Sequence, residues 1–542
     1  MPTYSGDELL LDGNAAQPDL GAPVPTDIRK HRRERFAEWF LLVLYAIAVG
    51  FTVTRHEPWA DEAQAWLIAK ALPFWRMLLG QVRYEGTPGL WHSILWALSH
   101  AGLPYASMFW FSWAAAVAGA WVLLTYSPFP LFLRALIPFT FYLSYQFAIV
   151  ARSYVLMPVL IFTAVHLLRN HPRRAFFFSL VTGLLANCNL FGLFISSGLV
   201  LVYLWQNRNH PARFVLFAKV LAPWLLFVAA AVAIAIPPKD LRFVPTPLGD
   251  ALARHRGLPV PPPIGGSYDP PLRQRVQEYT TPLSHSLWLG ALFLGVIVWQ
   301  AARRHTLIAL VPVACLIVSF ELVYKMPRHT GLFLLVLIAA LWLVWPDRTV
   351  PLRRYLPPDL ACAAIFLLIC LPQVAWAIRA IHYDATQNYS GSRACADYLK
   401  THAAGRKVFG YDYFTVAVSA FFDAPIFQNQ PTQYWSWSNT NTTDLQMNRI
   451  VFERPDYVVL SWHQNAQFGY LISTTLSPSA IQMQDYLRAT GYTRAALFTG
   501  SQVMRSSFAE RDFFEVYRRP DISEAQWSFM QYRLYDPPGI QH

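Results

Sequence analysis

Long apolar runs separated by short polar turns fill much of the chain. They recur from Phe36 to about Ile381, and runs of roughly 17 to 25 residues are long enough to cross a hydrocarbon core of about 30 Å as helices. We therefore expect a mainly α-helical, polytopic membrane protein. The pattern predicts eleven membrane-spanning helices, at residues 36–54, 105–126, 130–150, 153–168, 174–190, 192–206, 213–236, 285–301, 305–323, 329–345 and 360–380.

Arginine and lysine are concentrated in short turns between these runs, and such turns stay on the cytoplasmic side of a membrane. With eleven spans, all of them fall on the same side as the N-terminal cluster "IRKHRRER" (28–35). We therefore expect residues 1–35 to form a disordered cytoplasmic tail and residues 36–381 to form the transmembrane domain. The basic turns are "RNHPRR" (169–174), "QNRNHPAR" (206–213), "AARRH" (301–305) and "DRTVPLRR" (347–354).

A shorter apolar stretch, "GLWHSILWALSHAGLP" (89–104), fits a full span poorly. It has 16 residues, including two histidines, and prolines mark its ends. If it crossed the membrane, the four basic turns would fall on the wrong side. We expect a helix that lies at the outer surface or dips into it.

Eleven crossings that start in the cytoplasm also place several segments on the outer side. They are the first external loop (55–104), the turns at 150–154 and 324–329, and a loop at 237–284 that contains eleven prolines. Long loops are often functional, so this Pro-rich loop is a candidate to close over a substrate. Its basic residues include Arg242, Arg254 and Arg256.

The chain changes character after Ile381, where polar turns separate short alternating stretches. We expect residues 382–542 to form an extracytoplasmic α/β domain. "SPSAIQMQDYLRATG" (477–491) has the Ser start and Gly stop of a helix, and "YWSWSN" (434–439) offers exposed aromatic side chains to a sugar or a membrane surface. Four stretches read as strands: 406–412, 456–462, 494–500 and 513–519.

Composition agrees with a membrane protein, because 54% hydrophobic and 14% charged residues are unusual for a soluble one. The formal net charge of +12 lies largely in the basic turns, so it indicates membrane orientation and not nucleic-acid binding. The five cysteines show no metal-type spacing, and four lie inside apolar runs. No disulfide framework is expected.

An acidic cluster follows the first span, in "RHEPWADEAQAWLIAK" (55–70). Asp61 and Glu62 begin a predicted helix, where acids complement the helix dipole, so they could be ordinary surface acids. Trp59 and Trp66, however, suit a membrane interface, and Asp61 shares a helix face with Gln64. A carboxylate at this boundary can meet an acceptor from water and a lipid-borne donor from the bilayer.

Here the chain resembles a family. "WADEAQAWLIAKAL" (59–72), followed by "YEGTPGLWHSIL" (84–95), is similar to the first external loop of C-type (GT-C) glycosyltransferases, such as protein O-mannosyltransferases and bacterial aminoarabinose transferases. "ARSYVL" (151–156) and "YKMPRHTGLFLL" (324–335) resemble two later turns, so the similarity covers most of residues 36–345. The chain has Thr-Pro-Gly (87–89) where several relatives have Lys-Pro-Pro, and no second Asp in the turn at 152–154.

The resemblance implies an inverting hexosyl- or pentosyltransferase that uses a polyprenyl-phosphate sugar. Asp61 would be the general base and Glu62 the second catalytic acid, with Glu57 and Glu85 as alternatives for that second role. External cations would bind the donor phosphate, although such residues often only snorkel to the interface. The expected substrate-binding residues are Glu57, Gln64, Arg152, Tyr154, Lys325, Arg328 and His329.

The expected partners are the lipid-linked donor, the bilayer, and a glycan, lipid or protein acceptor. No cofactor is expected, although the acids with His56 could hold a divalent cation. The family's bacterial members point to the inner membrane, with the site and the C-terminal domain in the periplasm. A transporter or flippase of a lipid-linked glycan is the main alternative, favoured by Arg134 and Glu321 near span ends or interiors. A non-enzymatic assembly subunit is a third reading.

Overall fold

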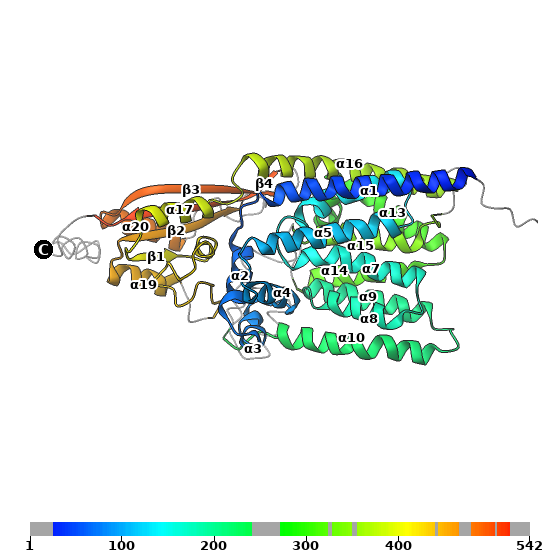
Figure 1. Cartoon of the computed structure of the whole chain (residues 1–542), viewed down its shortest axis with the longest axis horizontal. Coiled ribbons are helices and arrows are strands. Elements are labelled where there is room, and N and C mark those ends of the chain that lie inside the picture. Colours follow the sequence, from blue (N-terminus) through cyan, green and yellow to red (C-terminus); the bar gives the residue numbers. More distant parts are fainter. Residues whose placement is uncertain are drawn as a thin grey trace, which may run out of the picture.

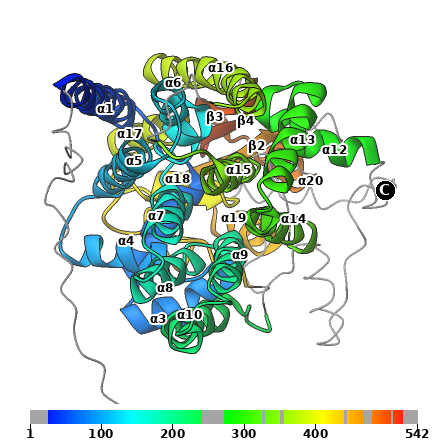
Figure 2. The same ribbon diagram turned by 90° about the vertical axis from the view of Figure 1, so that its right-hand side faces the viewer.

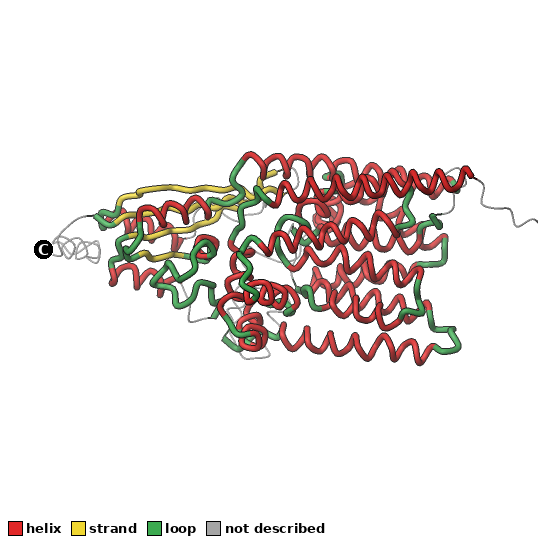
Figure 3. Tube along the Cα trace, viewed as in Figure 1, coloured by secondary structure: helices red, strands yellow, loops and turns green. Residues whose placement is uncertain are grey.

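A bundle of long helices and a small sheet domain lie end to end (Figures 1 and 3). The computed structural model describes residues 25–240, 272–323, 328–348, 355–438, 443–465, 478–504 and 507–520. The short helices after the first long helix lie where the two parts meet (Figure 1). We call this region the junction.

The bundle helices run along the long axis of the molecule (Figure 1). Helix α15 lies in the middle of the bundle (Figure 2), and each of its residues except Leu343 is buried. Apolar side chains also cover much of the outside, with Leu226 74% and Trp288 81% exposed. The bundle helices are α1 (Pro25–Val53), α5 (Ser107–Tyr126), α7 (Met157–Asn170), α8 (Ala175–Ala186), α9 (Leu190–Gln206), α10 (Arg213–Ala235), α12 (Leu272–Ser284), α13 (Leu287–Arg303), α14 (Val311–Leu322), α15 (Gly331–Val344) and α16 (Pro357–Thr386).

Several of these helices are long and apolar enough to cross a bilayer, which indicates a membrane protein. A sixth candidate is a pair of helices, Val276–Ser284 and Leu287–Arg303, bent by 96° at a short break. Four further apolar helices are shorter. The five candidate spans that need no bend are Arg32–Val53, Ser107–Tyr126, Ser153–Asn170, Arg213–Ala235 and Pro357–Thr386.

Two predictions of element boundaries were wrong. The predicted span 130–150 is not one helix, because α6 (Leu131–Leu136) passes into a 3-10 turn and then a π-helical turn at Tyr142–Gln146. Pro138 has no backbone N–H to continue a helix, and Thr140 takes an extended conformation (φ −64°, ψ 150°). Helix α1 begins at Pro25, so residues 25–35 are helical and not part of a disordered tail.

At the junction, α2 (Ala60–Ala71), α3 (Phe74–Leu79) and α4 (Leu90–His100) follow α1. Helix α4 runs across the bundle and not along it (Figure 2). It covers most of the stretch at 89–104, in the direction expected of a surface helix. A 3-10 helix, Gln81–Glu85, lies between α3 and α4.

The C-terminal domain holds one four-stranded sheet in the order β1-β2-β4-β3. Strand β1 (Val408–Tyr411) pairs parallel with β2 (Tyr457–Asn465), while β4 (Ser507–Arg518) pairs antiparallel with β2 and with β3 (Thr493–Met504). All four predicted strands are confirmed, and so is the helix predicted at 477–491. The domain's helices are α17 (Ser392–His402), α18 (Thr415–Ser419), α19 (Thr443–Glu453) and α20 (Pro478–Ala489).

The domain and the bundle share a hydrophobic core at the junction. Ala60, Ala63 and Leu67 of α2 belong to the same buried cluster as Val459 of β2 and Phe514 of β4. Successive turns of α2 therefore present one apolar face to the domain. Because α2 also carries Asp61, this packing fixes the domain relative to that carboxylate.

Candidate active site at the junction

Asp61 lies in the first turn of α2, where three distant segments meet its carboxylate. Its Oδ2 is 2.8 Å from Nη1 of Arg152 and 3.5 Å from Nη2 of Arg328. Its Oδ1 accepts a hydrogen bond of 2.9 Å from the hydroxyl of Tyr413. The side chain keeps 18% exposure. Asp61 is thus held by bundle residues on one oxygen and by the C-terminal domain on the other.

Electrostatics keep Asp61 ionised. Burial raises the pKa of its carboxyl group, but the positive charges of Arg152 and Arg328 outweigh burial, so the pKa lies below its ordinary value of 3.8. The hydrogen bond from Tyr413 lowers this pKa further. At neutral pH Asp61 is therefore a carboxylate that can accept a proton.

The two guanidinium groups are positioned by Trp59. Its ring centroid lies 5.2 Å from the guanidinium carbon of Arg328 and 6.0 Å from that of Arg152, distances at which cations are attracted to aromatic faces. The side chains of Arg152 and Arg328 are only 22% and 20% exposed. They are directed into the junction and do not extend freely into solvent.

Gln64 joins α2 to the aromatic segment of the C-terminal domain. Its side-chain amide donates to the carbonyl of Trp435 (2.8 Å) and accepts from the backbone N–H of Trp435 (2.8 Å). The same amide nitrogen donates to Glu85 at 2.8 Å. Gln64 is 1% exposed, so it acts as a clamp and does not face the space beside Asp61.

This clamp brings three aromatic rings to Asp61, which we call the aromatic wall: Tyr413, Trp435 and Trp437. The ring centroids of Tyr413 and Trp437 are 4.7 Å apart, and Trp435 lies 6.2 Å from Tyr413. Trp437 also donates a hydrogen bond to Glu85. Burial raises the pKa of Glu85 to about 7, despite its hydrogen bonds, so this carboxyl group changes charge near neutral pH.

Glu62 occupies a different position from the one expected of a second catalytic acid. It is completely buried, and its Oε1 accepts a hydrogen bond of 2.6 Å from the backbone N–H of Ala151. Its Oε2 accepts from the N–H of Trp59 at 3.1 Å, closing the first turn of α2. Glu62 therefore fixes the backbone beside Arg152.

A buried ionic network that the sequence did not predict supports Glu62. Nε2 of His56 is 3.3 Å from Oε2 of Glu62, and its Nδ1 is 2.8 Å from Oδ2 of Asp384 at the end of α16. The hydroxyl of Tyr145 donates to the same oxygen of Asp384 at 3.1 Å. Burial lowers the pKa of His56, but the two carboxylates outweigh it and raise it to about 10. A protonated imidazole donates at both nitrogens, which satisfies this arrangement.

Replacing His56 by glutamine is expected to lower the free energy of unfolding by about 3–5 kcal/mol, because two buried carboxylates lose their shared cation. Since the pKa of His56 is raised above 6.5, its contribution to stability is complete below pH 6.5 and is lost as the pH rises through about 10. Denaturation of the detergent-solubilised protein across this range measures both effects. His402→Gln, on the exposed end of α17, is the control. A variant as stable as wild type at neutral pH would contradict the ionic network.

The other predicted residues lie around this centre. Tyr154 and His329 are buried with their ring centroids 5.4 Å apart, and both pack against Phe191 behind the arginines. Burial raises the pKa of Glu57 to about 7, although the positive charge of Arg393 in the C-terminal domain lowers it. Lys325 lies outside the described residues, as do Arg242, Arg254 and Arg256.

The start of the Pro-rich loop lies beside the junction. Tyr84 donates hydrogen bonds to both carboxylate oxygens of Asp240, at 2.8 and 2.9 Å, and Arg83 donates to the carbonyl of Ile236 at 2.9 Å. Residues 241–271 of the loop predicted at 237–284 lie outside the described residues. Among the residues that the structure describes, no group of three His, Cys, Asp or Glu side chains is arranged to hold a metal ion.

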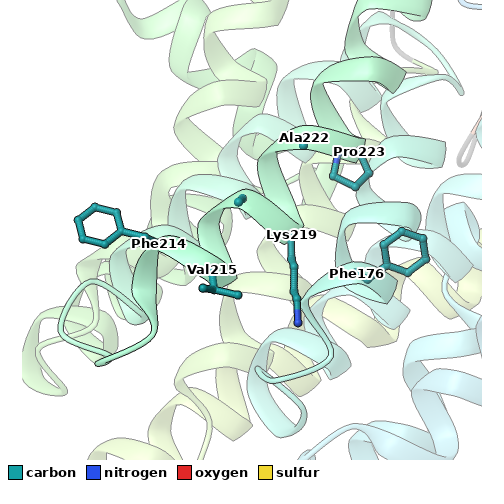
Figure 4. Close-up of a pocket in the computed structure, with 7 residues that line it drawn as sticks. Phe176, Phe214, Val215, Lys219, Ala222 and Pro223 are labelled. Atoms are coloured by element: carbon teal, nitrogen blue, oxygen red, sulfur yellow. The ribbon is translucent and has the colours of Figure 1, made fainter.

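A groove of about 610 Å³ lies on the outside of the bundle, between α8 and α10 (Figure 4). Phe176, Phe214 and Val215 line it, and Lys219 is its one charged residue. It lies on the first half of α10, towards the end of the bundle opposite the C-terminal domain (Figure 1). The groove is apolar and contains none of the residues around Asp61, so it is not part of the candidate active site.

Chemically, the junction offers one ionised carboxylate, two guanidinium groups, a carboxyl group that titrates near pH 7 and an aromatic wall. This set can accept a proton, hold a phosphate and contact a flat, partly apolar molecule. No protein-family model matches the chain, and no curated protein matches it significantly. The functional assignment therefore depends on the chemistry of these residues.

Proposed function

We propose that the protein is an inverting glycosyltransferase of GT-C type that moves a sugar from a polyprenyl-phosphate donor to an acceptor hydroxyl. The observation that carries this proposal is the ion-paired carboxylate of Asp61 between Arg152 and Arg328, at the end of an apolar bundle. Helix α1 ends at Val53, shortly before Asp61, so a lipid-borne donor in the bilayer and an acceptor in water can both reach it.

In the proposed reaction the acceptor hydroxyl gives its proton to Asp61 while its oxygen bonds to the anomeric carbon. The bond between that carbon and the phosphate oxygen breaks, so a single displacement inverts the configuration. General-base catalysis of this kind typically contributes about 10²–10⁴-fold, and the orientation of donor and acceptor supplies much of the rest.

The leaving group is a polyprenyl phosphate whose negative charge grows as the bond breaks. Arg152 and Arg328 are the cations that would stabilise it, because a guanidinium group has five N–H donors and can serve a phosphate and Asp61 together. A guanidinium between the two anions also separates the base from the leaving group, which leaves room for the sugar. The proposal needs no cofactor, since these side chains supply the positive charge.

The proposed topology has eleven crossings, with the junction and the C-terminal domain outside the cytoplasm of a bacterial inner membrane. The basic turns support it, because eleven crossings place all of them on the cytoplasmic side. The shorter apolar helices also support it, because they can cross the membrane where neighbouring helices shield their ends from lipid. The segment at 130–150 would cross as a broken span inside the protein, since residues 141–151 are all buried.

Transfer of label tests the proposal. Purified protein in lipid vesicles is incubated with a radiolabelled polyprenyl-phosphate sugar and a membrane extract that supplies acceptors, and label is expected to move to an acceptor. The competing transporter would instead move intact donor across the vesicle membrane. Arg134 and Glu321, the two charged residues that favoured the transporter, both have partners. Arg134 forms an ion pair with Glu38, and Glu321 accepts a hydrogen bond from Tyr279. Donor translocation without transfer of label would replace our proposal by this alternative.

A further inference from the structure

The two oxygens of the Asp61 carboxylate face different partners. Oδ2 faces the guanidinium groups of Arg152 and Arg328, which come from the bundle. Oδ1 faces the phenol of Tyr413, which comes from the C-terminal domain. A donor phosphate belongs on the cationic side. The acceptor hydroxyl must then approach Oδ1, from the side of the C-terminal domain.

The Tyr413 hydroxyl already shows the geometry that an acceptor needs there. It donates a hydrogen bond of 2.9 Å to Oδ1, as an acceptor hydroxyl must do before its proton moves to the base. Tyr413 is only partly buried, and its contact with Asp61 joins residues that are 352 positions apart in the chain. We regard the phenol as occupying the position of the acceptor hydroxyl.

The surroundings of Tyr413 indicate the class of acceptor. Tyr413 and Trp437 are both partly exposed, and their rings form an adjoining surface beside Asp61. Trp435, which adjoins them, is held by two hydrogen bonds with Gln64. Aromatic faces bury large apolar areas at little entropic cost. Sugar rings present flat C–H faces to such surfaces and hydroxyl groups at their edges, where Asp61 and Glu85 lie.

We propose that Tyr413 and Trp437 form the acceptor subsite and that the acceptor is a carbohydrate, whose reacting hydroxyl replaces the Tyr413 hydroxyl at Oδ1 of Asp61. This inference rests on the proposed glycosyl transfer. It adds that the C-terminal domain supplies the acceptor side of the active site. A serine or threonine acceptor in a protein has no flat face that requires this aromatic surface.

The test uses the full-length protein in vesicles, a radiolabelled polyprenyl-phosphate sugar, and two acceptor probes: the lipid-linked glycan fraction and the protein fraction of a membrane extract. Label is expected in the glycan fraction. Trp437→Ala is expected to raise the KM for the glycan fraction at least about tenfold while the KM for the donor stays unchanged. Tyr413→Ala removes the other ring of the subsite and is expected to raise the same KM in the same direction. Trp288→Ala, which changes an exposed tryptophan of α13, is the matched control.

Different failures are distinguishable. Label only in the protein fraction would overturn the carbohydrate acceptor and leave the proposed glycosyl transfer intact. An unchanged KM for the glycan fraction in Trp437→Ala, or a rise in both KM values together, would overturn the acceptor subsite. A Tyr413→Ala variant that keeps the wild-type KM for the glycan fraction would remove this ring from the subsite. No transfer to either fraction by wild type would remove the proposed function and this inference together.

Discussion

Arg152→Ala is expected to lower the rate of sugar transfer by about 10²–10³-fold, the usual effect of removing one group that stabilises developing negative charge. Arg152 is 2.8 Å from Asp61 and adjoins Trp59. In the proposed reaction its guanidinium would stabilise the leaving phosphate. Arg152→Lys is expected to recover only part of the rate, because lysine keeps the charge but loses the planar set of donors. Initial rates with radiolabelled donor in vesicles measure both variants.

Arg208→Ala is the matched control, because Arg208 is an exposed arginine that packs on Trp205 at the end of α9, towards the opposite end of the bundle. It is expected to transfer at the wild-type rate. The substitution of Arg152 also removes a partner of Asp61, so the folded state should be checked by its melting temperature. An Arg152→Ala protein that keeps its fold and more than about one tenth of the wild-type rate would exclude this arginine from stabilising the leaving group.

Much of the fold follows from local patterns in the sequence. The apolar runs predict where most of the bundle helices lie, and alternation predicts the four strands of the C-terminal domain. The break at 130–150 was missed because its residues are as apolar as those of a helix. Only Pro138 hints at the irregular backbone, and a single proline also occurs inside intact α10. Hydropathy measures burial, and it does not report backbone hydrogen bonding.

Some residues of the candidate site could also be predicted from the sequence, and others could not. Asp61, Arg152 and Arg328 could be named from the sequence because each lies at a polar turn beside an apolar run, and the structure brings them together. Tyr413 and Asp384 could not be named, because their contacts with Asp61 and His56 join residues 352 and 328 positions apart. No local pattern encodes such distances. Glu62 and Asp61 are adjacent acids, so their charge gives no reason to assign them different roles. The structure shows the difference, because Glu62 is fully buried and Asp61 is not.

Asp61→Asn carries the largest expected effect, because the amide keeps the size of the side chain and an oxygen for Tyr413 but cannot accept a proton. We expect transfer to fall by about 10²–10⁴-fold, with little change in the KM for the donor. Asp423→Asn is the control, since this aspartate is fully exposed on the C-terminal domain. Donor binding that survives in Asp61→Asn would show that the loss is in the chemical step.

The most direct measurement is therefore the initial rate at which purified Asp61→Asn and wild-type protein, in matched vesicles, move label from a polyprenyl-phosphate sugar to an acceptor. Our account predicts steady transfer by wild type and a rate at least about a hundredfold lower for the variant. Equal rates for the two proteins would contradict the assignment of Asp61 as the base.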